Sequence, residues 1–229
     1  MSLIKKNLNL IYIFIKIFFS FLVNLYYSRI GAFPIDTFLH YDSSARILKG
    51  EIPIRNFWIV SGLTIDFIQS LFFNLFGVNW YAYVFHSSIF NSLISLIIYF
   101  YFLNLKIGKT ISLFLTCCFS ILAYTISGTP FVDHHAIFFL LISTILLIKV
   151  INDEKNYLWF LIILFSFLSF FTKQVPASYT ILIQGFLIIF YIFYEKKLII
   201  LNYIVLSSFI VIFIFASFLL YFNIDFKDF

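Results

Sequence analysis

The sequence predicts an all-α, multi-pass transmembrane helix bundle of about seven spans. Of its 229 residues, 63% are hydrophobic and only 11% are charged, and the mean hydropathy is +1.06. Apolar runs of roughly 18 or more residues, the length of a helix that crosses a bilayer, recur along the whole chain. A soluble domain needs charged residues to cover its surface, and this chain has too few of them. We therefore exclude a soluble fold.

The apolar runs define the expected spans, which together form a single transmembrane domain over residues 1–229. We expect the spans at roughly 8–30, 79–104, 109–127, 135–151, 157–172, 176–194 and 198–222. The first run is too long and too aromatic for a signal peptide and lacks a small-residue cleavage site, so we interpret it as a retained helix. The run at 157–172 is short for a full crossing.

The segment between the first two spans, 31–78, has a different texture and predicts juxtamembrane helices. Residues 36–49 have the pattern of an amphipathic helix in the membrane interface, bounded by Pro34 and Gly50. Its apolar face contains Phe38, Tyr41, Ala45 and Leu48, and Asp36, His40, Ser43 and Lys49 lie off that face. A second, strongly apolar helix is expected over 62–77.

The distribution of basic residues favours a cytoplasmic N-terminus in the cell (inner) membrane. This orientation places eight basic residues inside, namely Lys5, Lys6, Lys106, Lys109, Lys149, Lys155, Lys196 and Lys197. It places six outside, namely Arg29, Arg46, Lys49, Arg55, Lys173 and Lys227. Lys16 lies within the first span, close enough to its inner end that we expect its side chain to snorkel to the surface. Because the basic residues are scattered, they do not indicate nucleic-acid binding.

Asp36 stands at the outer end of the first span, where the surface helix begins. One interpretation is an N-cap, whose carboxylate accepts hydrogen bonds from free backbone N–H groups. The other is a carboxylate held at the interface as a base or to orient a nucleophile. Position alone does not separate the two interpretations.

Asp133 lies in the short loop SGTPFVDHHA, on the same predicted side of the membrane as Asp36. Gly128 and Pro130 indicate a turn there. The loop is either a solvated polar connection or part of a site, since charged residues at a membrane boundary are costly unless the site is wet or used. Two acids on separate outer loops suit a site in which one base activates an acceptor.

Three further features leave alternatives open. Asp36 and His40 are four residues apart and could bind a divalent cation with Asp133, His134 and His135, but adjacent histidines point in different directions, so we assign no metal. Lys173 either snorkels to the headgroups or holds a phosphate as a point charge. The adjacent Cys117 and Cys118 show neither disulfide nor metal-ligand spacing and are expected to be inert.

The outer segment resembles a known family. Its order of residues is Asp36, Tyr41, Ala45, Leu48, Gly50, Glu51, Pro53, Arg55, Asn56 and Phe57, followed by Ser61-Gly62-Leu63 and the stretch SLFFNLFG at 70–77. This order is similar to the first outer loop of GT-C glycosyltransferases, in particular the protein mannosyltransferase and RgtA/B/C/D-like group. Two positions depart from the pattern, because the proline expected before Leu63 is absent and Asn56 replaces an acid.

The resemblance implies transfer of a sugar from a polyprenyl-phosphate carrier to a glycan, lipid or protein acceptor on the extracytoplasmic face. By this likeness Asp36 is the catalytic base or acceptor-orienting carboxylate, and Asp133 is the second acid. The candidate substrate-binding residues are Lys173, His40, His134 and Arg55. A lipid-linked donor requires no nucleotide fold, and the sequence has neither a GxGxxG nor a GxxxxGK[ST] pattern.

Two alternatives from other classes remain. Members of this family are usually longer, and this chain ends soon after the seventh run, so we expect an N-terminal part or a truncated member, or else a non-catalytic membrane subunit. A lipid or solute transporter would show interrupted helices and ionisable residues at mid-membrane depth. Most charges here lie at the ends of the predicted spans and no internal repeat is visible, which counts against a transporter.

Overall fold

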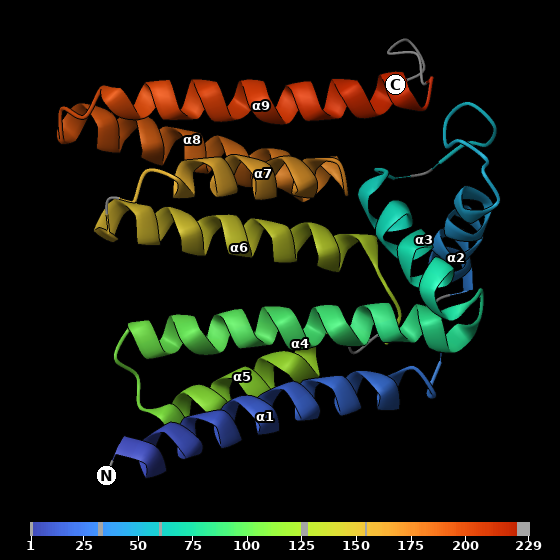
Figure 1. Ribbon diagram of the computed structural model, residues 1–229, viewed down its shortest axis with the longest axis horizontal. Helices are drawn as coiled ribbons and strands as arrows, with labels where there is room; N and C mark the ends of the chain where they lie inside the picture. Colours follow the sequence, from blue (N-terminus) through green and yellow to red (C-terminus); the bar gives the residue numbers. More distant parts are fainter. Residues whose placement is uncertain (1, 32–33, 60, 125–127, 154, 224–229) are drawn as a thin grey trace. The chain divides into compact units, whose positions relative to one another are not determined.

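The computed structural model describes residues 2–31, 34–59, 61–124, 128–153 and 155–223. These residues form nine α-helices joined by loops, which confirms the prediction of an all-α protein (Figure 1). The helices are α1 (Ser2–Tyr27), α2 (Pro34–Leu48), α3 (Thr64–Phe76), α4 (Trp80–Asn104), α5 (Lys109–Ala123), α6 (Val132–Asp153), α7 (Leu158–Phe170), α8 (Gln174–Tyr194) and α9 (Ile199–Tyr221). The loop between α2 and α3 contains an isolated bridge that pairs Pro53 with Phe57.

Five of these helices are long and apolar enough to cross a bilayer. They are α1 (over Leu10–Tyr27), α4, α6, α8 and α9. Each of the seven predicted spans coincides with a helix, but α5 and α7 have only 15 and 13 residues. The structure is therefore that of a helical membrane protein, and the number of crossings stays a prediction.

The two helices α2 and α3 occupy the segment for which juxtamembrane helices were expected. Pro34 opens α2, where its missing N–H leaves no hydrogen bond unmade. Gly50 follows the end of α2 with φ +87°, and Gly77 follows α3 with φ +81°, both in the left-handed region that glycine enters at little cost. Sequence signals alone thus locate three of the four ends of these helices.

The chain divides into two compact units, each described here by itself. Unit 1 contains Met1–Leu48 and Ile68–His134, and unit 2 contains Lys49–Phe67 and His135–Phe229. The expectation of one transmembrane domain over 1–229 stays a prediction.

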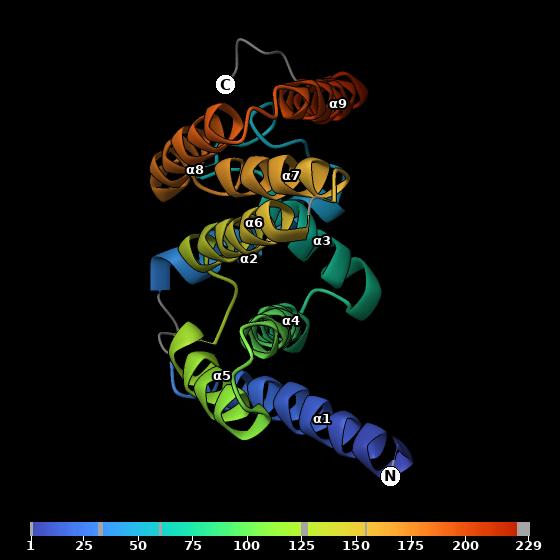
Figure 2. The ribbon, with the colours of Figure 1, turned by 90° about the vertical axis from the view of Figure 1, so that its left-hand side faces the viewer.

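In unit 1, α1, α4 and α5 lie side by side and share a buried polar seam (Figures 1 and 2). Lys16 is fully buried in this seam. Its Nζ donates hydrogen bonds to Ser20 Oγ at 2.9 Å, to the carbonyl oxygen of Thr116 at 2.6 Å, and to Ser120 Oγ. The expectation that Lys16 snorkels to the surface is wrong, because acceptors on its own helix and on α5 satisfy the ammonium inside the unit.

A second polar contact joins α1, α4 and the loop after α5. The side-chain nitrogen of Asn24 lies 2.9 Å from Ser87 Oγ, 3.2 Å from Ser88 Oγ and 2.8 Å from the carbonyl oxygen of Gly128. Gly128 has φ +63°, and a Cβ there would lie 2.5 Å from the backbone nitrogen of Ser28. Only glycine fits this close approach of the loop to α1.

Unit 2 consists of α6 to α9 and the loop before α3, with the four helices stacked in order of sequence (Figure 1). Its apolar core contains Leu147, Val150, Leu158, Trp159, Ile162, Ile188, Ile192 and Ile200. Beside this core, the hydroxyls of Ser143 and Ser166 lie 2.8 Å apart and each lies 3.3 Å from Oε1 of Gln184. Neighbouring helices of this unit are therefore joined by polar as well as apolar contacts.

The loop before α3 is tied to the connection between α7 and α8. The backbone N–H of Gly62 donates to the carbonyl oxygen of Thr172 at 3.0 Å, and that of Thr64 donates to Phe171 at 3.3 Å. A Cβ on Gly62 would lie 1.8 Å from the carbonyl oxygen of Phe171. The loop therefore lies directly on the α7–α8 connection.

Candidate functional site

Three segments that are distant in sequence meet at the first turn of α4 in unit 1. The hydroxyl of Tyr83 donates to the carbonyl oxygen of Thr37 at 2.8 Å and lies 3.5 Å from that of Pro130. The hydroxyls of Thr37 and Thr129 lie 3.4 Å apart. Tyr83, Thr37 and Thr129 are all fully buried. Because Thr37 follows Asp36 directly and Pro130 precedes Asp133 by one turn, this contact joins the two acid-bearing segments.

An aromatic cluster supports α2 beside this contact. The ring of Tyr41 lies 4.9 Å from that of Phe73 on α3 and 5.3 Å from that of Tyr83 on α4, both edge to face. Ala45 packs against the same cluster. Burial raises the pKa of the Tyr41 phenol above its ordinary value, so this hydroxyl stays protonated at neutral pH. The cluster fixes α2, and with it Asp36, against α3 and α4.

The surface of α2 differs from the predicted amphipathic pattern. Tyr41 and Ala45 are half-buried as part of the cluster, whereas Phe38 is 53% exposed and Leu48 is 38% exposed. His40 and Ser43, expected off the apolar face, are buried. The helix therefore packs through small and polar side chains as well as aromatic ones, while two of its apolar side chains remain available to lipid.

Asp36 lies in the first turn of α2 and is exposed. The helix begins two residues earlier, at Pro34, so Asp36 lies inside the first turn and not at the N-cap position. Among the described residues its carboxylate has no hydrogen-bond or ion-pair partner. The helix dipole still favours a negative charge there. The carboxylate is thus ionised and accessible, as a general base requires.

Asp133 lies in the first turn of α6 and is half-buried. His134 follows it, also half-buried, with its ring 5.1 Å from Tyr124 and 5.3 Å from Phe131. Both candidate acids therefore occupy the first turn of a helix, where free backbone N–H groups stabilise negative charge.

The remaining predicted residues divide between the two units. Asp36, His40, Asp133 and His134 belong to unit 1, and Arg55 and Lys173 belong to unit 2. Arg55 is exposed in the loop between α2 and α3. Lys173 is half-buried at the start of α8, and its backbone N–H donates to the carbonyl oxygen of Ser169 at 2.9 Å.

The described part of the chain contains no group of three or more His, Cys, Asp and Glu side chains that could hold a metal ion. The cation site considered for Asp36, His40, Asp133, His134 and His135 has no such group behind it. We assign no metal.

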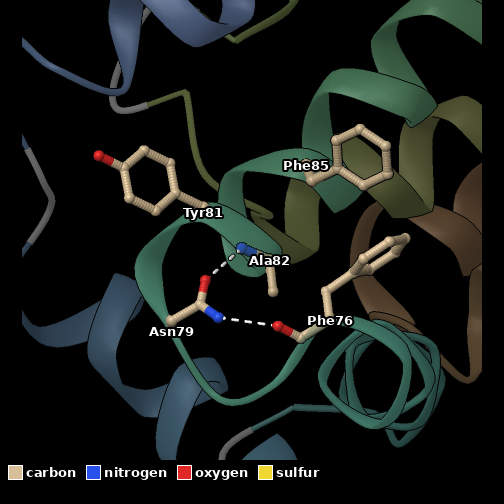
Figure 3. Close-up of a pocket in the computed structure, with 5 residues that line it drawn as sticks. All are labelled: Phe76, Asn79, Tyr81, Ala82 and Phe85. Atoms are coloured by element: carbon tan, nitrogen blue, oxygen red, sulfur yellow. Dashed lines mark hydrogen bonds between the residues drawn. The ribbon is translucent and has the colours of Figure 1, made fainter.

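A separate pocket of about 310 Å³ lies where α3 meets α4 (Figure 3). It is lined by Phe76, Asn79, Tyr81, Ala82 and Phe85. Asn79 caps α4, since its Oδ1 accepts from the backbone N–H of Ala82 at 2.9 Å and its Nδ2 donates to the carbonyl oxygen of Phe76 at 2.9 Å. The pocket is apolar and contains none of the predicted site residues. Tyr81, 80% exposed, borders it two residues before the buried Tyr83.

Sequence reasoning did not identify Tyr83, Thr37 or Thr129. No local pattern marks them, because their partners lie 46 and 92 residues away. The polar seam did leave a signal, since Lys16, Ser20, Asn24 and Ser28 recur every fourth residue through the first apolar run. This spacing marks one face of a helix turned toward the protein interior.

No protein-family model matches this chain, and neither a curated protein nor a solved structure matches it. The likeness of residues 36–77 to the GT-C first outer loop therefore stays a prediction.

Proposed function

We propose that this chain is a membrane glycosyltransferase of the GT-C type, or the N-terminal part of one. It transfers a sugar from a polyprenyl-phosphate carrier to a glycan, lipid or protein acceptor on the extracytoplasmic face. The observation that carries the proposal is the joining of the Asp36 and Asp133 segments through Tyr83. A site with two carboxylates can use one as a base while the other orients the acceptor.

In the proposed reaction, the carboxylate of Asp36 takes the proton of an acceptor hydroxyl. The acceptor oxygen bonds to the anomeric carbon of the sugar as the bond between that carbon and the carrier phosphate oxygen breaks. The phosphate leaves with the electron pair, and Asp133 orients the acceptor. Exposure of Asp36 supports its part in this scheme, because an acceptor must reach the base within hydrogen-bonding distance.

The other candidate residues would bind substrate. Lys173 and Arg55 are cations that suit the carrier phosphate, the first as a point charge and the second as a bidentate donor. His40 and His134 neighbour the two acids in the sequence and belong to the same unit as them. Their imidazoles would donate or accept hydrogen bonds to sugar hydroxyls.

Transfer of radiolabelled sugar from polyprenyl-phosphate-linked donors, in membranes that contain the full chain, tests the proposal. We expect Asp36→Asn to reduce transfer by roughly 10²- to 10⁴-fold, the usual contribution of a general base. Asp42→Asn is the matched control, because Asp42 is an exposed acid of the same helix whose nearest cation is Arg46 at 4.0 Å. Equal transfer by wild type and Asp36→Asn would refute the assignment, as would equal losses in both variants.

The proposed orientation places α2 outside and the α8–α9 turn inside the cell. Lys49 and Lys196 are exposed residues at these two places. In a chain with Cys117 and Cys118 replaced by serine, a membrane-impermeant maleimide added to intact cells should label Lys49→Cys and not Lys196→Cys. The reverse labelling would place both candidate acids on the cytoplasmic side and exclude an extracytoplasmic transfer.

A further inference from the structure

Tyr83 presents a buried hydroxyl at the junction of the two acid-bearing segments. Its ring packs among those of Tyr41, Phe73 and Trp80, at 5.3, 6.2 and 6.0 Å between centroids. A hydroxyl in such apolar surroundings is costly unless it is hydrogen-bonded. It donates to the carbonyl oxygen of Thr37, and the 3.5 Å contact to Pro130 is weaker.

The acceptor at Thr37 lies in the peptide unit directly after Asp36. A bond of 2.8 Å to this carbonyl fixes the orientation of the first turn of α2, and therefore the direction in which the Asp36 side chain leaves the backbone. The contact between the Thr37 and Thr129 hydroxyls ties the same turn to the loop that leads into Asp133. One buried junction thus determines the placement of both segments.

We propose that Tyr83 is a positioning residue that sets the geometry of Asp36 relative to the Asp133 segment, an inference that rests on the proposed glycosyl transfer. Tyr83 is fully buried and does not contact the acceptor or the donor itself. It acts through the backbone of Thr37. Displacement of a catalytic group by about 1 Å can cost roughly 10²-fold in rate.

Tyr83→Phe tests this inference, because it removes the hydroxyl and retains the ring that packs in the aromatic cluster. Tyr81→Phe is the matched control, since Tyr81 is on the same helix and 80% exposed. The full chain in lipid nanodiscs would be studied by amide hydrogen exchange and by sugar-transfer kinetics. We expect Tyr83→Phe to raise exchange over 36–44 and 129–136 by about five- to tenfold, as loss of one hydrogen bond implies, and Tyr81→Phe to change neither.

In the kinetics, we expect Tyr83→Phe to lower kcat by roughly 10- to 100-fold and to leave KM for the lipid-linked donor within about twofold. Unchanged exchange in both segments would overturn the inference. Raised exchange with unchanged kcat would also overturn it, while loss of transfer in Asp36→Asn would still support the glycosyltransferase. Raised exchange in a chain without any transfer would refute the proposed function and leave the structural junction supported.

A second variant covers the case in which Tyr83→Phe does not fold. Thr129→Val keeps the shape of the side chain and removes the hydroxyl that faces Thr37. We expect it to raise exchange in the same two segments by about two- to fivefold. Exchange at the wild-type level in a folded Thr129→Val chain would overturn the proposed junction.

Discussion

The side-chain nitrogen of Lys16 on α1 lies 2.6 Å from the carbonyl oxygen of Thr116 on α5. The two other acceptors of this ammonium are serine hydroxyls that can give their own protons to backbone carbonyls: Ser20 Oγ lies 2.8 Å from the oxygen of Lys16, and Ser120 Oγ lies 2.8 Å from that of Thr116. Both hydroxyl oxygens are then left to accept from the ammonium. The site therefore stabilises the charged form of a lysine inside a candidate span.

The first prediction concerns the asymmetry of this site. Replacing both Ser20 and Ser120 by alanine leaves a buried ammonium with one of its three acceptors, and we expect the free energy of unfolding to fall by about 3 kcal/mol. Lys16→Met removes the charge and leaves both serines bonded to carbonyls, so we expect a change within about 1 kcal/mol. Reversible unfolding in bicelles measures both, with Ser178→Ala as an exposed control whose hydroxyl bonds its own helix. A larger loss in Lys16→Met than in the double variant would contradict this account.

The second prediction concerns the close approach of Gly128 to α1. Alanine there would place Cβ 2.6 Å from the carbonyl oxygen of Asn24 in a backbone with φ +63°. We expect Gly128→Ala to lower the stability of unit 1 by about 2–4 kcal/mol, through steric overlap and backbone strain together. Gly108→Ala is the control, because a Cβ there meets nothing within 4 Å. Fluorescence of Trp80, in a chain with Trp58 and Trp159 replaced by phenylalanine, reports the unfolding of unit 1. Equal stability of the two variants would show that the loop moves away from α1 freely.

The helices of this protein follow from local signals in the sequence, and the candidate site does not. Apolar runs locate every long helix, and Pro34, Gly50 and Gly77 mark the ends of the loop helices. The burial of Lys16 was missed because a lysine within a few turns of a span end normally reaches the surface. What decides its burial is the presence of hydroxyl acceptors about 100 residues later, which no local pattern reveals.

The same distinction explains one departure from the GT-C pattern. The residue before Leu63 is Gly62, where that pattern has proline. The N–H of Gly62 donates to the carbonyl oxygen of Thr172, a hydrogen bond that proline cannot form. The sequence shows the substitution, but its physical reason lies in the α7–α8 connection, more than 100 residues away.

The third prediction tests this contact in unit 2. A Cβ on Gly62 would overlap the carbonyl oxygen of Phe171, so Gly62→Ala should push the loop off the α7–α8 connection. We expect a loss of stability of about 1–3 kcal/mol and faster amide exchange at residues 62 and 64, whose N–H groups are bonded there. Gly185→Ala, which meets nothing within 4 Å, should leave both measurements unchanged. Slow exchange at residues 62 and 64 in Gly62→Ala would mean that the connection shifts with the loop.

The fourth prediction concerns Gln184, the polar residue that joins three helices of unit 2. Its Oε1 accepts from Ser143 on α6 and Ser166 on α7, and its Nε2 donates to Thr144 on α6 at 2.9 Å. Interhelical hydrogen bonds in membranes contribute only about 0.6 kcal/mol each on average, so we expect Gln184→Leu to destabilise unit 2 by about 1–2 kcal/mol. Gln174→Leu, on the exposed start of the same helix, should change stability by less than about 0.5 kcal/mol.

Trp159 lies in the core of unit 2 and is 2% exposed, so its fluorescence reports this unfolding when Trp58 and Trp80 are replaced by phenylalanine. The comparison also separates polar from apolar packing. Leucine at position 184 adds apolar contacts to the neighbouring isoleucines, which line a pocket of about 250 Å³. If Gln184→Leu proves as stable as wild type or more so, apolar filling of this pocket outweighs the hydrogen bonds, and the polar cluster then serves to fix the register of α6, α7 and α8 rather than their stability.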